Sequence, residues 1–295
     1  MPKKKHAMSR FINPYTDFGF KKLFGEEASK DLLADLLNTL LPEKHQIATL
    51  EFRNPELLGE VARDRRVIFD IYCENEKKEP FIVEMQRAEQ ENFKDRALYY
   101  SAHPIREQGR QGRDWDFCLS TVYFIGILDF VFEPKDVAPT LIHEVSLKDK
   151  KGREFYEKLQ HIYVQMPVFD KEESELVTRQ DKWFYFLKNL PGLDHIPSIL
   201  KEEVFQKAFQ KAEYAAMPKL DRARHDQELN DYRTYMSVMR KAVKDGEARG
   251  EARGEAKGEA KRNVEIARSM KKDAIDPAVI AKHTGLSLEE IKRLK

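Results

Sequence analysis

Two neighbouring strand-like segments within residues 67–86 constrain the fold more than any other part of the sequence. Val67–Cys73 and Pro80–Gln86 are rich in β-branched and aromatic residues, and the polar segment Glu74–Glu79 separates them. This pattern is typical of a β-hairpin, because such residues pack well on a pleated surface and a polar break favours a turn. Side chains on a strand alternate between two faces. In the first segment one face carries Ile68, Asp70 and Tyr72, and in the second one face carries Ile82, Glu84 and Gln86.

An acidic residue lies in the middle of each predicted strand, among residues that favour burial. A carboxylate in an apolar strand is costly unless something pairs with it. Asp70 and Glu84 would supply hard oxygen ligands to Mg²⁺, which usually takes one or two protein carboxylates and keeps several waters. Gln86 lies roughly 7 Å beyond Glu84 on the same face and would hold a water or a phosphate oxygen. The spacing also fits two edge-strand acids that face solvent, so both interpretations stay open at this point.

These segments belong to a longer series that carries a family resemblance. In chain order the series is Ile12–Gly25, Phe69–Cys73, Val83–Gln86, Arg96–Ser101 and Val122–Phe130. It resembles the PD-(D/E)xK nuclease superfamily, in which an acid on one strand and an acid-x-lysine on the next build a magnesium site. More closely, it resembles the bacterial family of PD-(D/E)xK transposases, also called recombination-promoting nucleases. The resemblance covers most of residues 8–240.

The resemblance implies a fold, a reaction and a set of site residues. The implied fold is α/β and restriction-endonuclease-like, with a mixed central sheet flanked by helices and a helical C-terminal extension. The implied reaction is hydrolysis of DNA phosphodiester bonds by a magnesium-dependent endonuclease, with Mn²⁺ as the other candidate ion. Asp70, Glu84 and the main-chain carbonyl of Met85 would hold the metal. Gln86 would orient the attacking water, at the position where the superfamily pattern has lysine.

Two other functions stay open, because Gln86 is neutral and the chain contains a repeat. One is a catalytically degenerate nuclease fold that binds DNA or a protein without cutting. The other is an oligomeric scaffold assembled through residues 246–261. Loss of cleavage on Asp70→Ala would favour the nuclease over both.

Contacts to double-stranded DNA must come from a local patch, because the chain carries little net charge. Lys and Arg number 52 against 51 Asp and Glu, which gives a formal net charge of +1. The sequence therefore provides no global basic field for nucleic acid. Residues near the predicted hairpin and on the helix after it are candidates for phosphate contact, with a solvated face as the alternative. They are Arg65, Arg66, Arg87, Lys94, Arg96, Tyr100 and Gln108.

Composition divides the chain into four segments. Residues 1–10 are predicted to be a disordered terminus, and residues 11–240 the nuclease-like domain, with most strands early and helices late. Residues 245–262 contain four Gly-Glu-Ala-Arg/Lys repeats. This segment is expected to be a flexible linker or a marginal helix, since each glycine in a helix costs about 1 kcal/mol relative to alanine. If it is a helix, its stripes of small residues would favour a homo-oligomer. Residues 263–295 resemble a small helix-turn-helix unit.

The remaining features concern a third candidate acid, the kinds of site that the sequence excludes, and the cellular compartment. Asp17 begins the predicted helix at residues 18–24, either as its N-cap or as a third acid of the metal site. The sequence contains no zinc-ligand spacing, no phosphate-binding glycine loop and no nucleophile motif. Its two cysteines suit a reducing compartment, and no apolar run reaches the ~20 residues of a membrane span. We therefore expect a cytoplasmic protein.

Overall fold

The computed structural model describes residues 9–57, 67–109, 116–134 and 136–294. The chain divides into two compact units, Met1–Asn230 and Asp231–Lys295, and each is described by itself. Within the described ranges, no helix combines the length and the apolar character that crossing a membrane requires.

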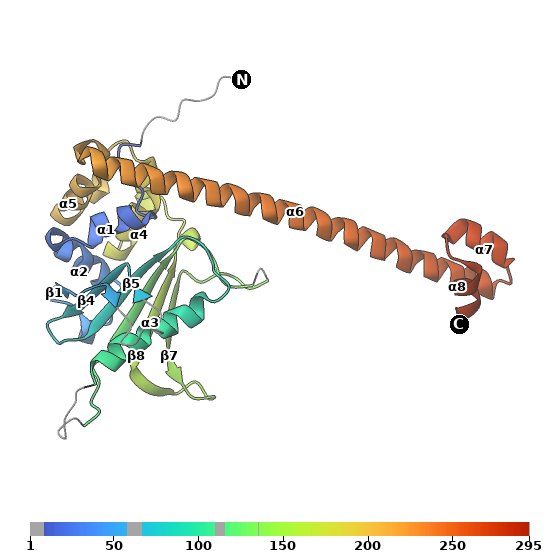
Figure 1. The fold of residues 1–295 in the computed structure, drawn as a ribbon, viewed down its shortest axis with the longest axis horizontal. Coiled ribbons are helices and arrows are strands. Elements are labelled where there is room, and N and C mark those ends of the chain that lie inside the picture. The colour runs from blue at the N-terminus through green and yellow to red at the C-terminus, as the bar shows by residue number, and fades with distance from the viewer. Residues whose placement is uncertain (1–8, 58–66, 110–115, 135, 295) are drawn as a thin grey trace. The chain divides into compact units, whose positions relative to one another are not determined.

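A mixed six-stranded sheet forms the centre of the first unit, in the order β1-β4-β5-β6-β8-β7 (Figure 1). The β5–β6 and β6–β8 pairs are parallel and the other pairs are antiparallel. Every residue of β6 is buried, as its uninterrupted apolar sequence predicts for a strand with neighbours on both sides. The strands are β1 (Leu50–Phe52), β4 (Ile71–Asn75), β5 (Pro80–Gln86), β6 (Val122–Leu128), β7 (Ile142–Lys148) and β8 (Glu154–Gln165).

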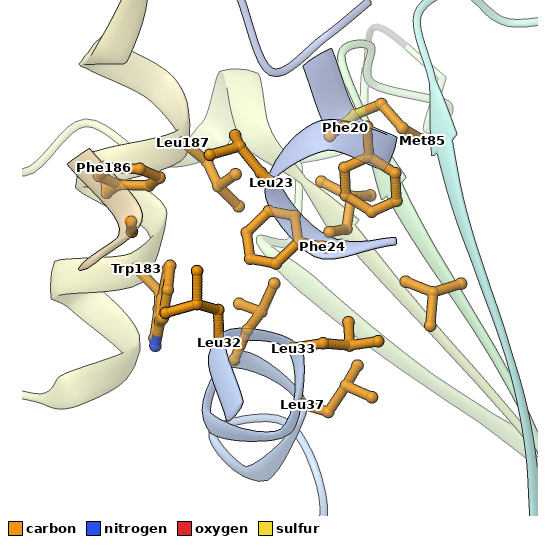
Figure 2. Packing of buried hydrophobic residues seen from close by; sticks show 14 of the residues in the cluster. Phe20, Leu23, Phe24, Leu32, Leu33, Leu37, Met85, Trp183, Phe186 and Leu187 are labelled. Atoms are coloured by element: carbon orange, nitrogen blue, oxygen red, sulfur yellow. The ribbon is translucent and has the colours of Figure 1, made fainter. Parts of the chain in front are cut away.

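Helices cover both faces of this sheet, and the alternation of side chains along β5 shows the two layers. Val83 belongs to the larger buried cluster with helices α1, α2, α4 and α5. Figure 2 shows aromatic and leucine side chains of α1, α2 and α4 meeting in this cluster. Ile82 belongs to a second cluster with α3. The predicted α/β fold, a mixed sheet flanked by helices, is therefore confirmed. The helices are α1 (Asp17–Phe24), α2 (Lys30–Asn38), α3 (Phe93–Glu107), α4 (Arg179–Asn189), α5 (Glu203–Ala212) and α6 (Lys219–Lys272), joined by short 3₁₀ turns.

The first strand of the predicted hairpin is divided in two. Val67–Ile68 form β3, which pairs with β2 (Glu56–Leu57) in a separate two-stranded sheet, and the pairing of β4 with β5 begins only at Ile71. Between them, the N–H of Phe69 donates to the carbonyl of Pro55 at 2.9 Å instead of to β5. The prediction of one continuous strand over residues 67–73 is therefore wrong, because residue pattern does not reveal where a strand changes its partner.

The entry into α1 depends on a close main-chain approach at Gly19. Thr16 is the N-cap, and its Oγ1 accepts the N–H of Gly19 at 2.9 Å, so Asp17 is the first helical residue rather than the cap. A Cβ added at Gly19 would lie 2.0 Å from the carbonyl oxygen of Asn13, a separation that no side chain tolerates. Glycine is therefore required at this position by space.

The second unit consists of residues 231–272 of α6 with α7 (Pro277–Thr284) and α8 (Leu288–Arg293). Its buried cluster is formed by Ala267, Ile280 and Ile291. A capping box between Ser287 and Glu290 begins α8. Residues 245–262 are helical within α6.

Candidate active site

Asp70 and Glu84 lie side by side at one end of the β4–β5 hairpin. The main-chain N–H of Asp70 donates to Glu84 Oε1 at 3.1 Å. The main-chain N–H of Met85, next to Glu84, donates to Asp70 Oδ2 at 2.8 Å. Each carboxyl group is therefore held by the main chain beside the other acid, and the fold brings the two acids to one place.

The end of the β4–β5 ladder creates this arrangement. In a continued antiparallel ladder, the N–H of Met85 would bond to the main chain of the neighbouring strand. The first part of the predicted strand instead pairs with β2, and the carboxylate of Asp70 accepts that N–H. Since the N–H and C=O of one strand residue point to the same side, the carbonyl of Met85 also faces the edge where Asp70 lies.

Burial raises the pKa of both carboxyl groups, to about 6 for Asp70 and to about 8 for Glu84. Glu84 is only 4% exposed, and the negative charge of Asp70 is the second cause of its raised pKa. At Asp70, the N–H of Met85 and the nearby Lys21 act to lower the pKa, while Asp17 raises it. Without a cation between them, the two acids therefore resist carrying two negative charges together.

The donor atoms at this position fit a hard divalent cation. Two carboxyl groups and one main-chain carbonyl are oxygen ligands of the kind that Mg²⁺ and Mn²⁺ take, and a divalent ion would offset the cost of burying two like charges. Within the part of the chain that the structure describes, no group of three or more His, Cys, Asp or Glu side chains could hold a metal. An ion at Asp70 and Glu84 would therefore complete its shell with water, as Mg²⁺ commonly does.

Gln86 connects Glu84 to a cation on α3. Its Nε2 donates to Glu84 Oε2 at 3.0 Å, and its Oε1 accepts a short hydrogen bond from the Arg96 guanidinium. The positive charge of Arg96 also lowers the pKa of Glu84, against the larger effect of burial. A guanidinium from α3 therefore lies beside the position that a lysine occupies in the superfamily pattern.

A second cation, Lys21, reaches the site from α1. Its Nζ lies 2.7 Å from Asp17 Oδ1 and 3.9 Å from Asp70 Oδ1. The residue pattern of the sequence alone did not single out Lys21. The available signal was its i,i+4 spacing from Asp17 on a predicted helix, within a segment that already carried the family resemblance. Asp17 itself lies close enough to Asp70 to raise its pKa, so α1 contributes an acid and a cation.

Of the seven predicted DNA contacts, the structure brings Arg96 to the two acids. Arg65 and Arg66 lie outside the described residues. Arg87 is 3.8 Å from Glu228 of α6, and Lys94 lies over the ring of Phe132, 4.7 Å from its centroid.

The other two predicted contacts take part in packing and main-chain bonds. Tyr100 packs edge-on against Phe69, with ring centroids 5.2 Å apart. Gln108 accepts the main-chain N–H of Ser120 at 2.6 Å.

Comparison with known proteins gives a family match. A family model described as PD-(D/E)XK nuclease family transposase matches residues 14–242. No curated protein and no solved structure matches the chain. The matched range includes both acids, Gln86 and the two cations beside them, and it spans well over half of the sequence. The chain therefore belongs to the PD-(D/E)XK nuclease family transposases.

Proposed function

We propose that this protein is a metal-dependent endonuclease of the recombination-promoting type, which hydrolyses phosphodiester bonds in double-stranded DNA. The observation that supports the proposal is the pair Asp70 and Glu84, each bonded to the main chain beside the other, in a member of a nuclease family. Nucleases of this family generally use divalent metal ions. The cytoplasm is the compartment that we expect for this activity.

The residues of the site would have separate roles in the hydrolysis. Asp70, Glu84 and the carbonyl of Met85 would hold Mg²⁺ or Mn²⁺. When bound, such an ion polarises the scissile phosphate and lowers the pKa of a bound water. Gln86, held between Glu84 and Arg96, would position that water through its amide.

Lys21 and Arg96 would provide the positive charge that the neutral Gln86 lacks. Lys21 lies beside Asp70 and Arg96 beside Gln86, and the two side chains come from helices packed on opposite faces of the sheet. Charge of this kind stabilises a transition state when it is already in place before the phosphate becomes more negative.

Plasmid cleavage with Mg²⁺ or Mn²⁺ tests the proposal directly. We expect Asp70→Asn and Glu84→Gln each to lower the cleavage rate by more than about 100-fold, because each replaces a charged metal ligand by a neutral amide. Glu51→Gln is the matched control, since Glu51 is an exposed acid on the edge strand β1, and it should cleave like wild type. Equal cleavage by wild type and Asp70→Asn would refute the assignment.

A binding module without activity is the second candidate, and the engagement of both polar ends of Gln86 favours it. In that case, wild type would bind DNA but leave plasmid intact with either metal. Calorimetric titration of Mn²⁺ into wild type and Asp70→Asn separates the two functions further. A nuclease requires that wild type binds the ion and that the variant binds it much more weakly.

A further inference from the structure

A cavity of about 350 Å³ lies at the end of β6 away from the acid pair. Its wall contains Tyr123, near the start of β6. Glu84 and Met85 instead pair with Gly126 and Ile127, further along the same strand. Residues from β7, from β8, from α4 and from the end of α2 complete the wall. The cavity is therefore separate from the candidate active site.

Three glutamates give this cavity a negative charge. They are Glu144 of β7 and Glu154 and Glu157 of β8. The Nζ of Lys44, also in the wall, lies 2.9 Å from Glu157 Oε2. Within the described part of the chain, the carboxylates of Glu144 and Glu154 make no hydrogen bond or ion pair. One lysine cannot neutralise three acids, so the cavity keeps an excess of negative charge.

Two glutamines in the wall add further hydrogen-bond acceptors. Gln160 Nε2 donates to the carbonyl of Glu157 at 2.7 Å, and Gln180 Nε2 donates to the carbonyl of Thr39 at 2.6 Å. These bonds fix the orientation of each amide and leave its Oε1 as an acceptor. The wall therefore presents mainly acceptors, which suits a ligand rich in N–H groups.

The hydroxyl of Tyr123 is an independent sign of a ligand. The residue is only 2% exposed, and its ring stacks on Phe81 with centroids 5.1 Å apart. Among the described residues, none forms a hydrogen bond with this hydroxyl. Burial and the charges of Glu79, Glu157 and Glu144 raise the pKa of the phenol, so it stays protonated at neutral pH. Buried tyrosine hydroxyls usually have a partner, so this one points to a bound polar group.

The lining selects an organic cation rather than a metal ion. Within the residues that the structure describes, no group of three or more His, Cys, Asp or Glu side chains could hold a metal. Apolar side chains of Leu41, Ile142 and Ile162 share the wall with the acids. An ammonium group donates three hydrogen bonds, and the methylene groups attached to it can cover apolar surface.

We propose that this cavity binds a linear polyamine, with its ammonium groups at Glu144 and Glu154 and its methylene chain along the apolar wall. In the β7–β8 ladder, Glu154 pairs with Lys148, four residues beyond Glu144 on β7. Four residues of a strand span roughly 13 Å. The two acids are therefore too far apart for one compact cation, whereas a chain with an ammonium group at each end can reach both.

Calorimetric titration of spermidine into the full chain tests the proposal, at an ionic strength of about 0.15 M, which screens diffuse attraction. We expect one site per chain. Glu144→Gln and Glu154→Gln should each raise the dissociation constant by at least about tenfold, because each removes a charged acceptor. n-Butylamine has one ammonium group and should bind at least about tenfold more weakly than spermidine to wild type.

Tyr123→Phe keeps the stacked ring and removes only the hydroxyl, so it should raise the dissociation constant by about threefold to tenfold. Glu51→Gln is the matched control, because Glu51 lies on β1 at the opposite edge of the sheet, and it should bind spermidine like wild type. Asp70→Asn should also bind like wild type, which separates this cavity from the acid pair.

Four results would overturn the proposal. They are no binding by wild type, wild-type affinity in Glu144→Gln, wild-type affinity in Tyr123→Phe, and a loss of equal size in Glu51→Gln.

Discussion

At the scale of single residues, positive charge reaches the acid pair from helices on both faces of the sheet. Lys21 of α1 lies 3.9 Å from Asp70, and Arg96 of α3 bonds to Gln86. The site thus collects its cations from segments that are far apart in sequence.

Lys21→Ala should lower the cleavage rate by about 100-fold, because one fixed charge beside the scissile phosphate is lost. Lys22→Ala is the matched control on the same helix, since Lys22 pairs with Glu26 and Asp221 away from the acids. The measurement is single-turnover cleavage with saturating Mg²⁺. If both variants lose activity equally, the effect comes from α1 stability and the role of Lys21 is wrong.

Gln86→Lys alone should lower activity, although lysine matches the superfamily pattern. Gln86 Oε1 accepts a hydrogen bond from Arg96, so an ammonium group there would face a guanidinium at short range. Combining Gln86→Lys with Arg96→Gln exchanges the positions of cation and amide and should restore much of the lost rate. A double variant no better than the singles would contradict this exchange.

The metal-free protein should lose stability as the pH rises through the titration of the acid pair. Both carboxyl groups have pKa values raised by burial, so the folded state binds more protons than the unfolded state. Their contribution is complete below about pH 4 and is lost progressively as the pH approaches 8. In EDTA, the melting temperature should therefore fall less between pH 5.5 and pH 8 for Glu84→Gln than for wild type. Adding Mg²⁺ in place of EDTA should make this fall in melting temperature smaller for wild type. A fall of equal size in both proteins would count against burial of this charge.

At the scale of elements, the turn into α1 positions both Asp17 and Lys21. It depends on Gly19, where a Cβ would lie 2.0 Å from the Asn13 carbonyl oxygen. Gly19→Ala should lower the free energy of unfolding by about 1–3 kcal/mol and reduce cleavage as well, because the main chain must shift. Gly192→Ala meets nothing within 4 Å and should change stability little. Denaturant titration of the two variants makes the comparison, and equal stabilities would show that the turn adapts without cost.

The hairpin shows what residue pattern does and does not predict at this scale. The pairing of β4 with β5 follows from two apolar segments around a polar break, and the structure confirms it. The change of partner before Ile71 does not follow, because it depends on Pro55, whose carbonyl takes the N–H of Phe69. That contact is made only when the chain is folded, and it frees the edge of β5 for Asp70.

At the scale of the whole molecule, the near-zero net charge limits how the DNA of the proposed function would be held. With 52 basic and 51 acidic residues, affinity for DNA would have to come from a few phosphates near the site. Fluorescence anisotropy can measure the DNA-binding constant of Asp70→Asn at several salt concentrations. A plot of the logarithm of this constant against the logarithm of the salt concentration should have a slope of about −2 to −4, since each phosphate contact contributes about −0.9. A slope near −8 would require an extended basic surface that the net charge does not predict.

The sequence by itself determined the family resemblance, the α/β class, the pairing of two strands and the identity of the two central acids. These features depend on residue type, on alternation along a strand and on short spacings, which are local properties of the chain. Only the tertiary structure decided that Lys21 and Arg96 stand beside the acids, and that Gln86 bonds to both Glu84 and Arg96. The physical reason is that these groups come from α1, β5 and α3, and their distances exist only after the helices have packed against opposite faces of the sheet.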